Sequence, residues 1–168
     1  MSYPEPRYTG DTGEVSATFR RAGQPAELQY RTGNTVHYLA TGASTGGHFG
    51  LYRWDFSVEP SGPSPHFHRT ISESFFILSG TVRLYNGKEW VDATAGDYCY
   101  VPEGGIHAFR NESGKEASML ILFAPGAPRE EYFETLAKFA GNPQVSDAER
   151  AERAEIAEIA LRHDNIWL

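Results

Sequence analysis

Apolar and polar side chains alternate along several short stretches of this chain, as in strands that have one buried face. The clearest stretch covers residues 48–59, and its apolar positions share one face: Tyr52, Trp54, Phe56 and Val58. Asn86-Gly87 predicts a two-residue hairpin, because both residues tolerate the positive φ that such a turn needs. Turn residues recur about every ten positions, which favours a closed or sandwiched β architecture. The other strands are expected at residues 35–40, 73–78, 81–85, 88–93, 98–101, 106–110 and 118–123.

The pattern changes to helical periodicity after Pro125-Gly126. A first helix is expected over residues 130–140, and Gly141-Asn142-Pro143 ends it. Its apolar face consists of Tyr132, Leu136 and Phe139. Ser146, with Glu149 three positions later, predicts the start of a second, strongly charged helix.

Three segments follow from these patterns. Residues 1–29 are weakly patterned and are expected to form an N-terminal arm. Residues 30–126 hold the predicted strands, so we expect them to form a single β domain. Residues 127–168 form a helical extension that packs on the β domain or on a partner subunit.

Composition narrows the classes of function. A net charge of −7 argues against nucleic acid or an anionic membrane as a partner. No apolar run approaches the roughly 20 residues that a membrane helix needs. The polar start has no apolar signal segment, so we expect a cytoplasmic protein. The only cysteine is Cys99, which excludes an intrachain disulfide.

Four residues stand out as candidate metal ligands: His66, His68, Glu73 and His107. Side chains alternate along a strand, so the two histidines of the H-x-H pair point to the same face. Glu73 needs a bend to return to that point, and His107 must arrive from a different strand. Three imidazoles and one carboxylate make a complete set of protein ligands for one divalent transition metal ion, with room for water or substrate.

The two segments that hold these residues, 65–80 and 96–111, resemble the signature motifs of the cupin superfamily. The second segment matches the family pattern at its defining positions: Gly96, Pro102, Gly104, His107 and Asn111. The first matches at the two histidines, at Glu73 and at Gly80, but Pro60 stands where the family has its leading glycine. The resemblance implies a mainly β fold, a single conical cupin barrel of the jelly-roll type, and a homodimer. It also implies that His66, His68, Glu73 and His107 hold the metal inside the barrel.

Within the superfamily, the chain resembles bacterial quercetinase-like monocupin dioxygenases. This resemblance rests on the H-F-H…E ligand set and on the segment P-G-A-P-R-E-E-Y-F-E-T-L-A (residues 125–137). It implies cleavage of a flat aromatic or enolic substrate, such as a flavonol, by O₂. Glu73 would then be both a ligand and the catalytic base. The metal would be Fe, Ni, Mn or Cu, with Zn also possible, and no organic cofactor is expected.

Aromatic side chains are expected to line the pocket beside this metal. The candidates are Trp54, Phe67, Phe75, Tyr100 and Phe109 from the strands, and Tyr132 and Phe133 from the first helix. Such a lining suits a flat, largely apolar ligand rather than a charged sugar or phosphate. Alternatively, these aromatics fill the core of a small domain. The arginines at 53, 83 and 110 are expected to face outward.

Two other functions fit the same residues. One is a non-oxidative metal-dependent cupin, such as a polyketide cyclase or an isomerase, with zinc as a Lewis acid. The other is a metal-containing module that binds a small molecule without turnover. The identity of the metal and the need for O₂ would separate the first of these from a dioxygenase.

Overall fold

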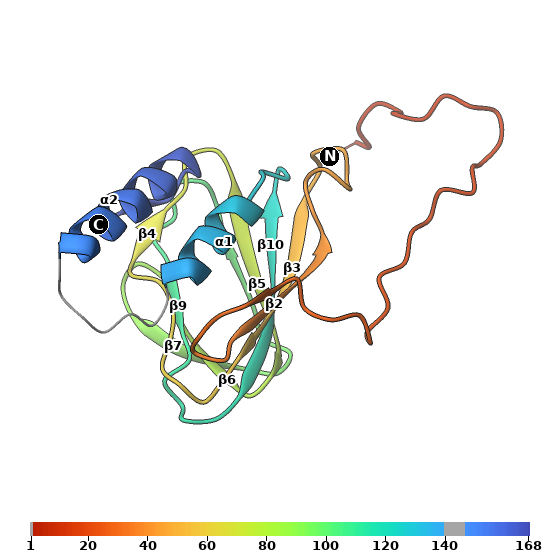
Figure 1. The fold of residues 1–168 in the computed structure, drawn as a ribbon. Helices are drawn as coiled ribbons and strands as arrows, with labels where there is room; N and C mark the ends of the chain where they lie inside the picture. The colour runs from red at the N-terminus through yellow and green to blue at the C-terminus, as the bar shows by residue number, and fades with distance from the viewer. Residues whose placement is uncertain (1, 140–146) are drawn as a thin grey trace.

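The computed structural model describes residues 2–139 and 147–168, with the side chains of 147–152 left out of the description. The expected helix end at residues 141–143 and the expected cap at Ser146 lie outside the described residues. Figure 1 shows two packed groups of strands with both helices at one end. None of the described helices is long and apolar enough to cross a membrane.

The described chain contains eleven strands and two helices. Their order is β1 (Leu28–Gln29), β2 (Thr35–Ala40), β3 (Gly50–Phe56), β4 (His66–Phe67), β5 (Ser72–Ser79), β6 (Thr81–Tyr85), β7 (Trp90–Thr94), β8 (Tyr98–Val101), β9 (Ala108–Arg110), β10 (Ala117–Ala124), α1 (Glu130–Phe139), α2 (Asp147–Arg162) and β11 (Ile166–Trp167). The prediction of a mainly β protein with C-terminal helices is confirmed. The last strand, β11, was not expected.

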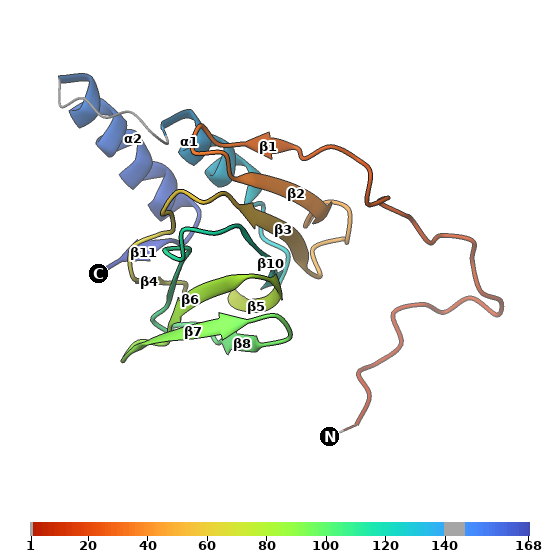
Figure 2. The ribbon, with the colours of Figure 1, turned by 90° about the horizontal axis from the view of Figure 1, so that it is seen from below.

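All strand pairs are antiparallel and form three sheets. A six-stranded sheet has the order β1-β2-β3-β10-β5-β8, and a three-stranded sheet has the order β7-β6-β9. The third sheet pairs β11 with β4, which brings the C-terminal end of the chain beside His66. Figure 2 shows the sheets around a common interior.

The core forms where the alternating strands turn their apolar faces inward. In β3, Tyr52, Trp54 and Phe56 are buried, and the residues between them are partly exposed. The partner strand β10 buries Met119 and Ile121 opposite Trp54 and Tyr52. Val58 was expected on the same face, but it lies beyond the end of β3 and is 49% exposed.

The connection between β6 and β7 differs from the predicted two-residue hairpin. Tyr85 pairs with Trp90, so the loop has four residues. Gly87 has a φ of 90°, whereas Asn86 keeps a negative φ. The Asn86 side-chain oxygen accepts hydrogen bonds from the backbone N–H groups of Lys88 and Glu89, each at 3.0 Å. This local bonding favours the longer turn.

Helix α1 covers the interior at one end of the sheets and buries Tyr132 and Phe133. Leu136 and Phe139, expected on its apolar face, are partly exposed. Helix α2 lies beside α1 and buries Ile159 and Ala160. The chain before β1 extends away from the sheets, as Figure 2 shows.

Candidate metal centre

Three separate elements bring the four predicted ligands together. His66 lies in β4, and His68 follows two positions later on the same face. His107 reaches His66 through reciprocal backbone hydrogen bonds, with N···O distances of 3.0 and 2.9 Å. Glu73 comes from β5, opposite Val101 and Phe123 on the neighbouring strands.

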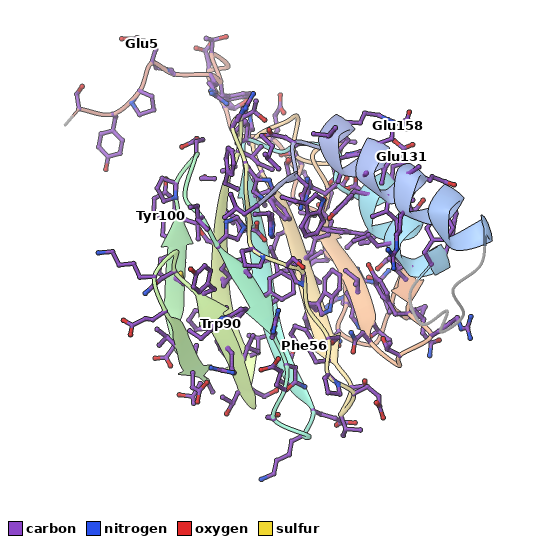
Figure 3. The ribbon with its side chains drawn as sticks, turned by 90° about the vertical axis from the view of Figure 1, so that its left-hand side faces the viewer. Glu5, Phe56, Trp90, Tyr100, Glu131 and Glu158 are labelled. Atoms are coloured by element: carbon purple, nitrogen blue, oxygen red, sulfur yellow. The ribbon has the colours of Figure 1, made fainter. Side chains whose placement is uncertain are left out.

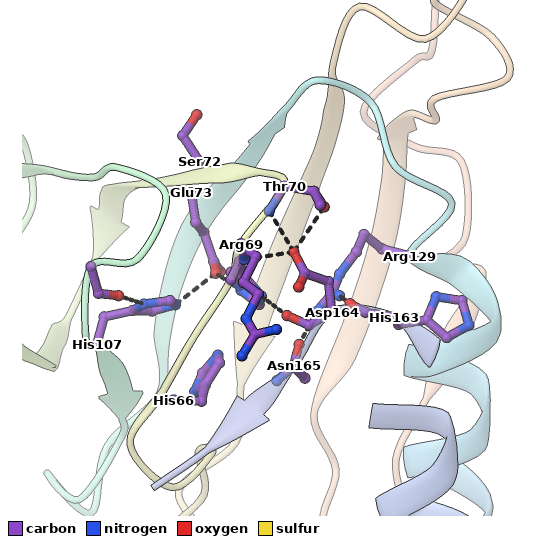
Figure 4. Close-up of polar contacts among 12 residues, drawn as sticks. His66, Arg69, Thr70, Ser72, Glu73, His107, Arg129, His163, Asp164 and Asn165 are labelled. Carbon is purple, nitrogen blue, oxygen red and sulfur yellow. Dashed lines mark hydrogen bonds and ion pairs between the residues drawn. The ribbon is translucent and has the colours of Figure 1, made fainter. Parts of the chain in front are cut away.

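The ligand atoms of these residues lie within 4.8 Å of one another. The four residues are 1–3% exposed, so the cluster is almost completely shielded from bulk solvent. Glu73 Oε2 lies 2.8 Å from His107 Nε2 and 3.0 Å from His68 Nε2. Figure 4 shows Glu73 pointing toward His107.

Each histidine donates a hydrogen bond from its Nδ1, which points away from the cluster, to a backbone carbonyl. His66 Nδ1 lies 2.9 Å from Ser64 O, and His107 Nδ1 lies 2.9 Å from Gly105 O. His68 Nδ1 lies 2.7 Å from Asp164 O. These bonds place the proton of a neutral ring on Nδ1 and leave the Nε2 lone pair facing inward.

A metal ion fits this arrangement for a physical reason. The inward Nε2 lone pairs of His68 and His107 face the oxygen of Glu73, so two acceptors would repel each other unless a cation or a proton lay between them. Imidazole nitrogen and carboxylate oxygen are also the donors that Fe, Ni, Mn, Cu and Zn accept. The cluster could therefore hold one divalent ion.

The electrostatics of the cluster agree with that interpretation. Burial, together with the neighbouring His107, lowers the pKa of His66 to about 4, so its ring is neutral at pH 7. Burial raises the pKa of Glu73, but His107 and His68 outweigh this effect and hold the pKa well below its usual value. Burial also lowers the pKa of His107, but Glu73 outweighs it and raises that pKa. The protein thus keeps an ionised carboxylate in its interior, as metal binding requires.

The C-terminal segment supports the strand that holds His66, and the sequence analysis assigned it no such role. Besides accepting the His68 bond, Asp164 accepts three hydrogen bonds through its side-chain Oδ2. The donors are Arg69 N at 2.8 Å, Thr70 N at 2.7 Å and Thr70 Oγ1 at 2.8 Å. Trp167 pairs with His66, and their rings lie 5.5 Å apart. The local sequence at residues 164–167 does not predict these contacts, because the residues that they contact lie about a hundred positions away in the chain.

A cavity of about 400 Å³ adjoins the cluster, with His66 and Glu73 in its wall. Four of the expected pocket residues line it: Trp54, Phe109, Tyr132 and Phe133. Sequence reasoning did not name several other lining residues, including Tyr30, Phe56, Phe123, Arg129, Asn165 and Trp167. Arg129 and Glu73 are the charged residues among those that the structure places on the cavity wall.

Three expected pocket residues lie elsewhere. Phe75 is 1% exposed and packs beneath His107 and Phe109 in the core. Tyr100 is 56% exposed on the outer side of β8, as Figure 3 shows. Phe67 follows His66 in β4 and therefore points to the opposite face of that strand. Side-chain alternation accounts for Phe67 and Tyr100, whereas Phe75 shares the face of Glu73 and is instead buried in the core by the packing of the sheets.

Comparison with known proteins agrees with this fold. Residues 54–123 match the model of the cupin domain family. An RmlC-like cupin from Shewanella frigidimarina superposes with a TM-score of 0.56 at 19% identity, over 70% of this chain and 96% of that one. KdgF from a Halomonas species superposes with a TM-score of 0.55 at 14% identity, over 65% of this chain and 94% of that one. The predicted cupin fold is confirmed.

Two relatives match in sequence over part of their length. An uncharacterized protein of Aquifex aeolicus is 36% identical over 62 residues, which cover 36% of this chain and 50% of that protein. Quercetin 2,3-dioxygenase of Bacillus subtilis is 27% identical over 111 residues, which cover 62% of this chain and 31% of the enzyme. The match thus spans half or less of each relative.

Proposed function

We propose that this protein, whose residues 54–123 form a cupin domain, is a metal-dependent dioxygenase acting on a flat aromatic or enolic substrate such as a flavonol. The observation that carries the proposal is the position of the metal cluster. His66 and Glu73 form part of the wall of an otherwise largely apolar cavity that is rich in aromatic side chains, so a planar substrate in the cavity would meet the ligand set directly. The match to the Bacillus dioxygenase supports the same reaction class.

The histidines would hold the ion, and their Nδ1 bonds to carbonyls fix the ring orientations that this requires. A redox-active divalent ion would supply the means of bringing O₂ and an electron-rich substrate together. The buried aromatic wall excludes water and favours stacking of a planar ring. These features support the binding of a planar ring system.

Glu73 would also act as the base that accepts the proton of an enolic hydroxyl. Its carboxylate is ionised, buried and on the cavity wall, so it can reach a hydroxyl group bound there.

The test combines metal analysis of the purified protein with O₂ uptake over a panel of flavonols. Stoichiometric Fe, Ni, Mn or Cu together with flavonol-dependent O₂ uptake is the expected result. Glu73→Gln should lose turnover more than metal content, whereas Glu103→Gln, on an exposed loop, should change neither. A fully active Glu73→Gln would refute the proton-transfer role. Zinc without O₂ uptake would instead point to a Lewis-acid cyclase or isomerase.

A further inference from the structure

Arg129 is a buried cation on the wall of the cavity. The residue is 2% exposed, and its guanidinium carbon lies 4.7 Å from the ring centre of Tyr132 and 4.9 Å from that of Phe123. Such rings attract a guanidinium through their faces but offer it no hydrogen-bond acceptor. The guanidinium N–H groups therefore need hydrogen-bond acceptors other than these rings.

The described protein groups satisfy the guanidinium only in part. Its Nη1 donates to the carbonyl of His163, and its Nη2 donates to Asn165 Oδ1 at 2.6 Å. Both acceptors are neutral. Arg129 Nε has no acceptor, and Arg129 forms no ion pair, among the residues that the structure describes. A buried guanidinium without a carboxylate partner is costly for a protein to maintain.

A second donor on the same wall is also unsatisfied. The indole Nε1 of Trp54 is buried and has no acceptor in the described part of the chain. Arg129 Nε and Trp54 Nε1 are thus buried donors without described acceptors, and both belong to residues of the cavity wall. A ligand with acceptor oxygens would satisfy them.

The balance of charge in the cavity also favours a ligand with acceptor oxygens. If a divalent ion occupies the cluster and the three histidines are neutral, the positive charges of the ion and of Arg129 outnumber the single negative charge of Glu73. The remaining described lining residues carry no charge. An anionic group on the ligand would reduce this excess, and low polarity strengthens that attraction.

We propose that Arg129, assisted by Trp54, forms an anion subsite in the cavity and that the substrate is a planar aromatic compound bearing a carboxylate. The ring would pack against the aromatic wall, and the carboxylate would take the free N–H groups of the guanidinium in a charge-assisted bond. The inference rests on the proposed function for the planar ring alone. The aromatic side chains alone favoured a largely apolar ligand, whereas the buried charge of Arg129 favours an anionic one.

The test measures binding without turnover. 2-Naphthoate and 2-naphthalenemethanol share one ring system and differ in charge, so calorimetric titration of both isolates the contribution of the carboxylate. Each titration is run on zinc-loaded and on metal-free protein. Wild-type protein should prefer the naphthoate by about ten- to a hundredfold in both forms, the range for a charge-assisted hydrogen bond.

Variants assign that preference to a residue. Arg129→Met should abolish the preference and leave the affinity for the alcohol within about threefold, since only the charged contact is lost. Arg83→Met is the matched control, because it removes the same charge from an exposed site that pairs with Asp92 and Glu112. It should leave the preference unchanged. Thermal melting and zinc content establish that each variant is folded.

Several outcomes would overturn the subsite. One is equal binding of the two compounds by wild-type protein. Another is a preference for the naphthoate that survives Arg129→Met. The third is a preference that vanishes on metal removal, because the carboxylate would then bind the ion. If Arg129→Met does not fold, the wild-type comparison still decides, together with Trp54→Phe, which should weaken naphthoate binding selectively. Failure of the dioxygenase proposal is detected separately, by O₂ uptake, and leaves these binding results intact.

Discussion

Replacing Asp164 should weaken metal binding as well as the fold. Its Oδ2 accepts hydrogen bonds from the backbone N–H groups of Arg69 and Thr70 and from the Thr70 hydroxyl. Its backbone carbonyl accepts the bond from His68 Nδ1 that orients this ligand. The residue also has a φ of 57°, a left-handed conformation that aspartate and asparagine tolerate better than alanine.

These contacts set the size of the effect. A hydrogen bond to a charged group contributes about 1.5–3 kcal/mol, but Asp164 is only partly buried, so water replaces some of the loss. We therefore expect Asp164→Ala to lower the free energy of unfolding by about 3–4 kcal/mol, including about 1 kcal/mol for the left-handed backbone. Asp164→Asn keeps one acceptor and the backbone preference, so it should cost about 1–2 kcal/mol.

The assay compares metal affinity with stability. Urea unfolding of metal-free protein gives the loss of stability, and competition with a chromophoric chelator gives the metal affinity. Asp164→Ala should lower the affinity by about ten- to a hundredfold, as for other groups that orient a metal-bound histidine. Asp97→Ala is the matched control, because Asp97 Oδ2 similarly accepts bonds from Thr94, at 2.7 and 3.2 Å, in the turn between β7 and β8, and bonds none of the four candidate ligands.

The control should be destabilised without a change in metal affinity. The reasoning fails if Asp164→Ala binds metal as tightly as wild-type protein. It also fails if Asp97→Ala weakens binding equally, because a general loss of stability would then explain both results.

Two further predictions concern the metal and the N-terminal arm. Chelation should lower the melting temperature measured by calorimetry, and refilling the site should raise stability by about 1.4 kcal/mol for each tenfold excess of free ion over its Kd; an unchanged melting temperature would argue against a metal site. Burial raises the pKa of Glu27, but the hydrogen bonds from Tyr38 N and Arg20 outweigh it, so the pKa lies below the usual 4.5. The hydrogen bonds of ionised Glu27 therefore stabilise the fold fully above pH 4.5, and this stabilisation is lost as the pH falls through the lowered pKa. NMR titration of Glu27 should show a midpoint below 4.5, and Arg20→Gln should move that midpoint back toward 4.5.

The order of apolar residues determined much of the fold. Alternation in residues 50–56 places Tyr52, Trp54 and Phe56 in the core because successive side chains of a strand must point to opposite faces. The same rule puts His66 and His68 on one face, so the sequence already predicted the ligand set. These features depend on local backbone geometry, which the sequence specifies directly.

Local backbone geometry was insufficient to predict the structure where side-chain hydrogen bonds or the packing of the sheets changed the outcome. The dipeptide Asn86-Gly87 predicted a two-residue turn, but the Asn86 side chain binds the following N–H groups and opens the loop. Phe75 and Tyr100 were both plausible pocket residues, yet one lies in the deep core and the other on the outer surface. Which apolar position meets a cavity depends on how the sheets pack.

Only the tertiary structure decided the surroundings of the candidate metal site. Arg129 stands in a charged segment before α1, and nothing in its neighbourhood along the chain shows that its guanidinium is buried among aromatic rings. Asp164 reaches His68 across 96 positions of sequence. Such contacts arise when helices dock on the sheets, and docking depends on the summed burial of many residues rather than on any local pattern. The sequence therefore determined most of the strands and the candidate metal ligands, whereas the packing of the C-terminal segment decided what surrounds them.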